Sequence, residues 1–279
     1  MAQPLNYTPE ITHAGPEVAL ERVTDRQELA AFLHQDPIAH AYLLGNLDPA
    51  YFQFCKWYGL RDELGHLESL TLLYQGLSIP VVFMVGRTDR FGALASQSAR
   101  VVPGRHHFHV HEGQIQHLKD YFEITSYTRM HRMGLSREHF AGAPTDARVE
   151  RLGHRDTAAI MRLYEHFPDH FFEPYQLETG LYFGVRDARD GQLLAISGVH
   201  AVSEAHDVAV VGNLVTRPDM RGAGLATACT GQLLNELFER VSLVALNVQA
   251  NNEPAIRMYT NFGFRPNNIF FEGRSAGIR

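Results

Sequence analysis

The stretch that decides the fold is VTRPDMRGAGLATACTGQLL, residues 215–234, in which a glycine-rich turn separates a β-branched run from an apolar run with helical spacing. The order strand, glycine turn, helix start favours phosphate binding, because unpaired N–H groups of the first helical turn converge and the helix dipole adds positive potential. Gly222 and Gly224 let a ligand approach the backbone closely. Arg221 can add charge-assisted hydrogen bonds. The stretch therefore predicts a site for a phosphate-containing ligand.

Two common nucleotide sites do not fit this loop. A triphosphate site requires Lys followed by Ser or Thr after the second glycine of a longer loop, whereas Leu225-Ala226-Thr227 follows here. A dinucleotide site requires Gly or Ala at the position of Thr227 and an acidic residue at the end of the next strand. That strand ends in ALNVQANN, residues 245–252, which contains no acidic residue. Both readings are therefore rejected.

A second segment, LNVQANNEPAIRMYTNFGF (residues 246–264), follows after one amphipathic helix and one β-branched strand. Together the two segments resemble the acyl-CoA-binding motifs of the GNAT superfamily of N-acetyltransferases. The family's Arg/Gln-x-x-Gly-x-Gly/Ala pattern is matched by Arg221, Gly224 and Ala226, after a strand that ends with Leu214, Val215 and Pro218. The second segment supplies an Asn after the strand, a helix with Ala-x-x-x-Tyr, and a terminal Gly-Phe. The resemblance covers residues 147–274.

The resemblance implies an α/β (α+β) fold whose mixed central sheet, flanked by helices, splays between the strand at 208–217 and the strand at 242–249. Acyl-CoA would lie in that cleft, with its pantetheine arm along the first strand and its pyrophosphate on the glycine loop. The amide of Leu214 would polarise the thioester carbonyl, as in an oxyanion hole. The implied cofactor-binding residues are Leu214, Val215, Thr216, Arg221, Gly222, Ala223, Gly224, Leu225, Ala226, Thr227, Asn247, Asn252, Ala255 and Tyr259.

Tyr259 is also the predicted catalytic residue. Residues three and four apart share a helix face, so Ala255 and Tyr259 point to one side. In the family that side faces the cofactor's sulfur. A phenol near pKa 10 is protonated at neutral pH and can protonate the departing thiolate. The alternative is a core aromatic that packs beside Met258 and Phe262.

The base that accepts the proton of the amine is left open. The candidates are Glu173, Glu178, His200, Glu204 and Asp207. Cys229 falls inside the predicted helix at 225–241, so we interpret it as a packing residue and not as a nucleophile.

The chain of 279 residues is longer than a single core usually grows. The segment 137–152 interrupts the periodic patterning with Gly, Pro and Asp and predicts a linker. We therefore expect an N-terminal α/β domain at 1–145 and a catalytic GNAT acetyltransferase domain at 146–279.

In the first half we expect helices around 24–47, 91–99 and 115–122, and strands at 66–74, 79–86, 106–111 and 126–133. Its segments DPIAHAYLLGNLD (36–48) and FHVHEGQIQHLKDYF (108–122) resemble the N-terminal halves of two-domain acetyltransferases, which can be degenerate copies of the same fold. It lacks the glycine-loop pattern, so we expect no second cofactor site. A 146–279 fragment would then bind CoA, provided that it is soluble.

Three alternating histidines are candidate ligands for a metal ion. His107, His109 and His111 alternate, so on a strand they would share one face. Residues on one face lie about 6.5–7 Å apart along a strand, a long spacing for ligands of one ion. No nearby cysteine or carboxylate pair completes a ligand set, and we expect no metal.

The composition restricts the kinds of binding partner and the cell compartment that we expect for this protein. The net charge is −6 and no basic run of five residues occurs, which argues against nucleic acid. No apolar stretch approaches the roughly 20 residues that span a bilayer, and the N-terminus has no signal-peptide pattern. Cys55 and Cys229 have no metal-type spacing and suit a reducing compartment. We interpret the protein as cytoplasmic, with no membrane partner.

These observations predict an acyl-CoA-dependent N-acyltransferase. It would most simply transfer acetyl from acetyl-CoA, as co-substrate, to a primary amine of a small molecule or peptide by direct attack. The N-terminal domain would shape the acceptor site. One alternative is a non-catalytic CoA-binding regulatory module, against which the retention of Tyr259 argues. The other is transfer to a different acceptor, as in an O-acyl or aminoacyl transferase on the same scaffold.

Overall fold

The computed structural model describes residues 19–168 and 172–279. The N-terminal segment, for which the sequence predicts no signal peptide, lies outside this range. The described strands form one twelve-stranded mixed sheet. The strands of the first half are β1 Glu21–Val23, β2 Cys55–Arg61, β3 Leu67–Tyr74, β4 Val81–Gly86, β5 His106–His111 and β6 Phe122–Ser136. Those of the second half are β7 Val149–Arg151, β8 Phe183–Arg186, β9 Leu193–Ser203, β10 Val208–Thr216, β11 Leu243–Gln249 and β12 Arg265–Ile278.

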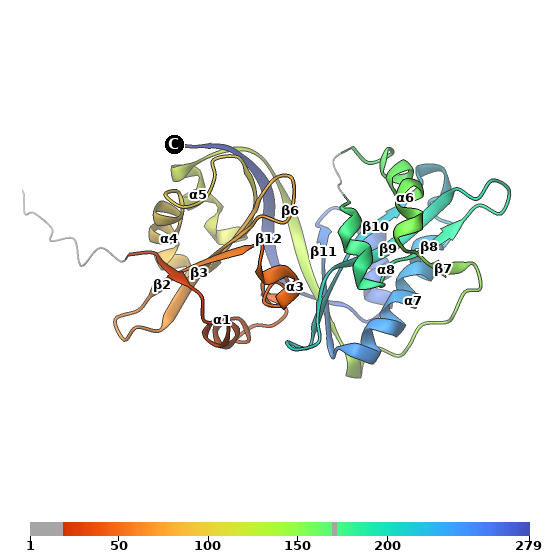
Figure 1. Cartoon of the computed structure of the whole chain (residues 1–279), viewed down its shortest axis with the longest axis horizontal. Helices are drawn as coiled ribbons and strands as arrows, with labels where there is room; N and C mark the ends of the chain where they lie inside the picture. The colour runs from red at the N-terminus through yellow and green to blue at the C-terminus, as the bar shows by residue number, and fades with distance from the viewer. Residues whose placement is uncertain (1–18, 169–171) are drawn as a thin grey trace, which may run out of the picture.

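Helices flank this sheet in both halves (Figure 1). The α-helices are α1 Arg26–Leu33, α2 Ala41–Gly45, α3 Pro49–Phe52, α4 Phe91–Ser98, α5 Ile115–Tyr121, α6 Thr157–Tyr164, α7 Leu225–Arg240 and α8 Glu253–Asn261. The short 3₁₀ helices are η1 Thr88–Arg90, η2 Glu112–Gln114, η3 Arg137–His139, η4 His154–Asp156, η5 Pro174–Thr179 and η6 Pro218–Met220. No helix in the described part of the chain is long and apolar enough to cross a membrane.

The strand order, β1-β2-β3-β4-β5-β12-β6-β11-β10-β9-β8-β7, is symmetric about its centre. Each strand of the first half has a counterpart in the mirrored position of the second half. The strand directions match as well, because β4 is parallel to β5 and β10 is parallel to β11. The predicted mixed α/β fold is confirmed, and the first half repeats the topology of the second.

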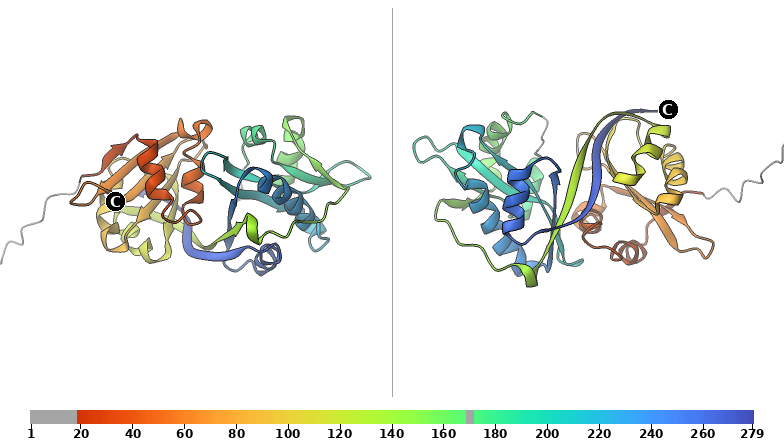
Figure 2. Two further views of the ribbon diagram at one scale, coloured as in Figure 1. Left: turned by 90° about the horizontal axis from the view of Figure 1, so that it is seen from below. Right: turned by 180° about the vertical axis from the view of Figure 1, so that it is seen from behind.

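The two halves exchange their last strands. β6 leaves the first half and pairs antiparallel with β11, from Ser136 opposite Leu243 to Met130 opposite Gln249. β12 leaves the second half and pairs with β5, and it pairs with β6 at the centre. In Figures 1 and 2 these two long strands cross the middle of the molecule between the two halves. The division at 145/146 stays a prediction, but a cut there would separate β11 from its partner.

The hydrophobic cores follow this exchange. Met133 and Leu135 of β6 belong to the first half by sequence, yet they are fully buried in the core of the second half. In the opposite sense, α2 packs on β9 and β10, and Ala201 and Val210 join the core formed by the first helices. Burying such apolar surface contributes about 25 cal/mol per Å², so both halves lose core stability if they are separated.

Two strands are longer than their sequence patterns indicate. β12, Arg265–Ile278, is a strand of 14 residues. The strand expected at 126–133 extends over Phe122–Ser136, 15 residues. Both are long because each pairs within one half and then continues into the other. The strand β2 was not predicted at all.

Candidate active site

The sheet opens between β10 and β11. Val211 is paired with Leu246, and beyond this pair no register partner joins the two parallel strands. The predicted splay is therefore confirmed. On its other side, β10 departs from the register of β9 between Gly212 and Val215. Leu214 therefore has no register partner on either neighbouring strand, which leaves this bulge as backbone that a ligand can approach.

Side chains hold the bulge in place. Asn213 has a φ of 52°, a left-handed conformation that Asn tolerates better than most residues. Its Nδ2 atom donates to Tyr182 Oη at 2.6 Å and to Gln176 Oε1 at 2.9 Å. Tyr182 in turn donates to the carbonyl of Val199 at 3.0 Å. The residues named for the pantetheine arm, Leu214 to Thr216, follow directly.

The glycine loop opens α7 as expected. Gly222 and Gly224 have φ values of 80° and 76°, and a Cβ atom would meet no heavy atom within 4 Å at either position. The first hydrogen bond of the helix runs from the Ala228 N–H to the Gly224 carbonyl at 3.0 Å. Within the described chain, the N–H groups of residues 222–227 donate no hydrogen bond to protein. Arg221 is exposed, with its guanidinium 5.9 Å from the Phe167 ring centre.

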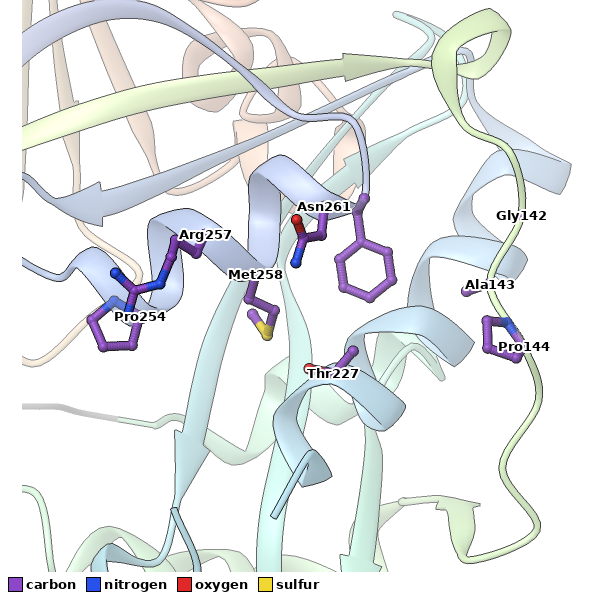
Figure 3. A pocket seen from close by; sticks show the side chains of 9 residues that line it. Gly142, Ala143, Pro144, Thr227, Pro254, Arg257, Met258 and Asn261 are labelled. Carbon is purple, nitrogen blue, oxygen red and sulfur yellow. The ribbon is translucent and has the colours of Figure 1, made fainter. Parts of the chain in front are cut away.

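A pocket of about 410 Å³ adjoins this loop (Figure 3). Thr227, in the first turn of α7, forms part of its wall, so the pocket continues from the loop. The other walls are the chain at 142–144 and the exposed face of α8. The α8 side chains are Pro254, Arg257, Met258 and Asn261, and Phe262 follows the helix.

Helix α8 buries Tyr259 in the hydrophobic core of the second half. Asn252 begins the helix, and its Oδ1 atom accepts a hydrogen bond from the Ala255 N–H at 3.3 Å. The ring of Tyr259 is 5% exposed and packs edge-to-face on Phe264, with ring centres 5.8 Å apart. Its hydroxyl makes no hydrogen bond to the described residues. Burial raises the pKa of Tyr259, so the phenol is protonated at neutral pH.

Asn247 lies where β11 separates from β10, and its side chain belongs to a polar network. Its Oδ1 atom accepts from Arg132 Nε at 2.9 Å. Its Nδ2 atom donates to Glu272 Oε1 at 3.0 Å. Sequence reasoning missed Arg132 and Glu272, because β6 and β12 bring them here from regions without a motif. The only signal was a charged residue inside each strand-like run.

Burial and charge set the properties of this network. Arg132 is 4% exposed and lies between the rings of Tyr42 and Phe270, with its guanidinium carbon 4.9 Å and 4.8 Å from their centres. Burial lowers its pKa. The side chain of Glu272 is one third exposed. Burial raises the pKa of Glu272 to about 7, although Arg132 and the Asn247 hydrogen bond oppose the shift.

The residues proposed as bases are widely separated. Glu204 and Asp207 lie in the β9–β10 turn, and Asp207 accepts a hydrogen bond from the Ser242 N–H at the closed end of the strands. His200 is at the open end, where a Cβ on Gly212 would lie 2.0 Å from its ring. Burial lowers the pKa of His200 to about 4.

The other two candidates lie at η5. Glu173 precedes this helix and its N–H donates to Gln176 Oε1, the atom that also accepts from the bulge residue Asn213. Glu178 is exposed. Neither side chain is placed in the polar network.

Two further expectations concern cysteine and histidine. Cys229 is fully buried, and burial raises the pKa of its thiol to about 12, so the thiolate needed for nucleophilic attack is absent at neutral pH. Of the histidine triplet, His109 stacks on Phe83, with ring centres 4.4 Å apart. No three His, Cys, Asp or Glu side chains of residues 19–168 and 172–279 are grouped to hold a metal ion.

Comparisons with known proteins agree with this geometry. Residues 153–264 match the model of the acetyltransferase (GNAT) family. A Drosophila protein of solved structure is 14% identical, with a TM-score of 0.70 over 91% of this chain and 98% of its own. A GCN5-related N-acetyltransferase from Sphaerobacter thermophilus is 12% identical, with a TM-score of 0.59 over 91% and 94%.

A tandem GNAT protein from the clavulanic acid biosynthesis pathway is also similar. It is 14% identical, with a TM-score of 0.56 over 92% of this chain and 98% of its own. At these identities the structures show a shared fold across both halves. No curated protein matches the chain.

Proposed function

From the GNAT acetyltransferase domain that residues 153–264 form, we propose that this protein is an acyl-CoA-dependent N-acyltransferase. It transfers acetyl from acetyl-CoA to a primary amine by direct attack of the nitrogen on the thioester. Membership of the family supports a transferase that uses acyl-CoA. Acetyl as the acyl group and an amine as the acceptor are the finer parts of the proposal.

The observation that carries the proposal is the loop at the start of α7. Its N–H groups over residues 222–227 have no acceptor among the described residues, and the positive end of a 16-residue helix lies behind them. Such a helix terminus stabilises a bound anion. The pyrophosphate of CoA binds there, with Arg221 free to add a charge-assisted hydrogen bond.

The rest of CoA extends from the loop in two directions. The pantetheine arm lies along residues 214–216 of β10, whose bulge leaves backbone groups without a strand partner. The nucleoside end lies in the pocket beside Thr227, where Arg257 of α8 is exposed. Asn252 and Ala255 border the arm from α8, and Asn247 borders it from β11.

Tyr259 supplies the proton to the leaving thiolate. Its buried phenol stays protonated at neutral pH, since burial raises its pKa. Its hydroxyl is not engaged by a described residue and is available for the sulfur. A positioned proton donor contributes typically 10²- to 10⁴-fold to rate.

Gly224→Asp tests the loop. Asp tolerates a positive φ better than most residues, so the variant should fold, but its carboxylate would repel pyrophosphate. We expect isothermal titration calorimetry to detect no CoA binding. Gly224→Asn, of equal size and uncharged, should retain weakened binding. Thr88→Asp, on the corresponding loop of the first half, should leave binding unchanged. Unaltered CoA affinity in a folded Gly224→Asp protein would refute the proposed site.

A non-catalytic CoA-binding module is the second candidate, since the loop and pocket would serve it equally well. Turnover of acetyl-CoA with a panel of primary amines separates the two. Release of CoA thiol that depends on the amine supports the enzyme. Tight CoA binding without turnover of any amine supports the module.

A further inference from the structure

The crossing strands bring a polar cluster to the centre of the molecule. It consists of two cross-strand pairs, Arg132 opposite Asn247 and His109 opposite Glu272. The pairs are connected, because Asn247 accepts from Arg132 and donates to Glu272. His109 Nδ1 lies 3.5 Å from the same carboxylate oxygen. Each half of the chain contributes two of the four residues, so neither half contains this cluster alone.

The cluster adjoins the point where the thioester is proposed to lie. Asn247 is the first residue of β11 beyond the last pair with β10. Across the opening, His200 covers Gly212. The ring of Tyr42 connects the two sides, with its centre 5.8 Å from that of His200 and 6.1 Å from that of His109.

Tyr42 also relates the cluster to the proposed acid. Burial raises the pKa of Tyr42 most, and the nearby Glu272 and Tyr259 raise it further, while Arg132 opposes them. The phenol of Tyr42 is therefore within electrostatic reach of both Glu272 and Tyr259. The ring of Tyr42 also lies against the cluster itself, with the guanidinium carbon of Arg132 4.9 Å from its centre.

Only one oxygen of the Glu272 carboxylate accepts a hydrogen bond from a described residue. Glu272 Oε1 accepts the Asn247 hydrogen bond, whereas Oε2 makes no hydrogen bond to the described residues. With one third of the side chain exposed, an incoming molecule can reach Oε2. If Glu272 served only to neutralise Arg132, the two side chains would be expected to form a direct ion pair. No ion pair between Glu272 and Arg132 is found in the described chain.

Resting on the proposed function, we propose that Glu272 is the general base, whose Oε2 accepts the proton of the acceptor amine. The amine nitrogen forms a bond to the thioester carbonyl carbon and loses a proton to Glu272. The carbon–sulfur bond then breaks, and the thiolate takes the proton of Tyr259. The products are an amide and CoA thiol, and solvent returns Tyr259 and Glu272 to their starting states.

The electrostatics suit this role. A base works best when its pKa is near the operating pH, and burial raises the pKa of Glu272 to about 7. Four groups face it: Arg132 from β6, His109 from β5, Asn247 from β11 and Tyr42 from α2. Arg132 and Asn247 lower the pKa, and burial outweighs them. Burial also lowers the pKa of His109 well below its usual range, so that ring is neutral near pH 7.

Glu272→Gln tests the base in the full-length protein. We expect kcat to fall at least about 100-fold at pH 7, the lower end of general-base contributions, with CoA affinity by calorimetry unchanged. The wild-type kcat/KM should rise with pH through an inflection near 7, and the variant should lose this inflection. Glu112→Gln, at an exposed carboxylate bonded to Arg129, is the matched control and should keep the wild-type profile.

Asn247→Ala provides a second readout. Its hydrogen bond lowers the pKa of Glu272, so its removal should move the inflection to higher pH. An unchanged kcat and pH profile in a folded Glu272→Gln protein overturns the base while leaving the proposed function intact. Wild-type protein that binds CoA but acylates no amine overturns both. Loss of CoA binding in Glu272→Gln also overturns the assignment, since it would place Glu272 in the cofactor site.

Discussion

The two halves of the molecule share one topology but differ at their parallel strands. In the second half, β10 and β11 separate after Val211 and Leu246. The chain then runs from β10 through η6 into the glycine loop. In the first half, pairing of β4 and β5 ends at Phe83 and His109. There the strand leads into η1 and α4 without a Gly-x-Gly sequence.

Side chains close the first half where the second stays open. Gln114, 2% exposed, is the N-cap residue of α5, and Asn252 is the N-cap residue of α8 at the corresponding place. Gln114 Nε2 donates to the Gly86 carbonyl of β4 at 3.0 Å, and its Oε1 accepts from the His111 N–H of β5 at 3.1 Å. Asn252 is one methylene shorter and bonds to its own helix. The comparison teaches that hydrophobic patterning specifies the same topology in both halves. A few polar side chains decide in which half the opening between the parallel strands stays free.

Separating the halves should have the largest effect. Fragment 146–279 lacks β6, so β11 loses its seven-residue pairing and the core loses Met133 and Leu135. We expect no cooperative unfolding transition by circular dichroism and no CoA binding, which reverses the expectation from sequence alone. Full-length chain cleaved at 141–145 should instead remain associated in gel filtration. A well-folded, CoA-binding 146–279 fragment would show that the strand exchange is dispensable.

The second prediction compares corresponding tyrosines. Tyr121 and Tyr259 are each the seventh residue of their helices, α5 and α8. Tyr259→Phe keeps the ring and removes the hydroxyl, so kcat should fall roughly 10²- to 10⁴-fold with CoA affinity nearly unchanged. Tyr121→Phe should leave kcat within experimental error. Equal turnover in both variants, measured where chemistry limits the rate, would remove Tyr259 from the mechanism.

The smallest effect is expected at Gln114. Gln114→Ala removes both bridging hydrogen bonds, each of which contributes about 0.5–1.5 kcal/mol. Thermal unfolding should shift downward, while calorimetry should still give one CoA per chain, because the first half has no glycine loop. Gln116→Ala, exposed on the same helix, is the control. A second CoA bound by Gln114→Ala would show that this glutamine alone blocks a cofactor site.

Local sequence determined much of the proposed cofactor site. Gly222 and Gly224 adopt positive φ as their lack of a Cβ allows, and the apolar spacing after them makes α7. The opening between β10 and β11 followed from the family resemblance. The glycine turn and the helix depend on contacts within a short span of chain, so periodicity and turn chemistry could predict them.

The centre of the molecule was decided only by tertiary structure. Arg132 and Glu272 are separated by 140 positions in sequence, and both reach Asn247 because β6 and β12 exchange between the halves. Local sequence does not encode which edge strand another strand will pair with, since pairing depends on the assembled sheet. The raised pKa of Glu272 is likewise a consequence of burial. The sequence by itself therefore determined two α/β halves and one glycine loop, while the tertiary structure decided which charged side chains meet beside it.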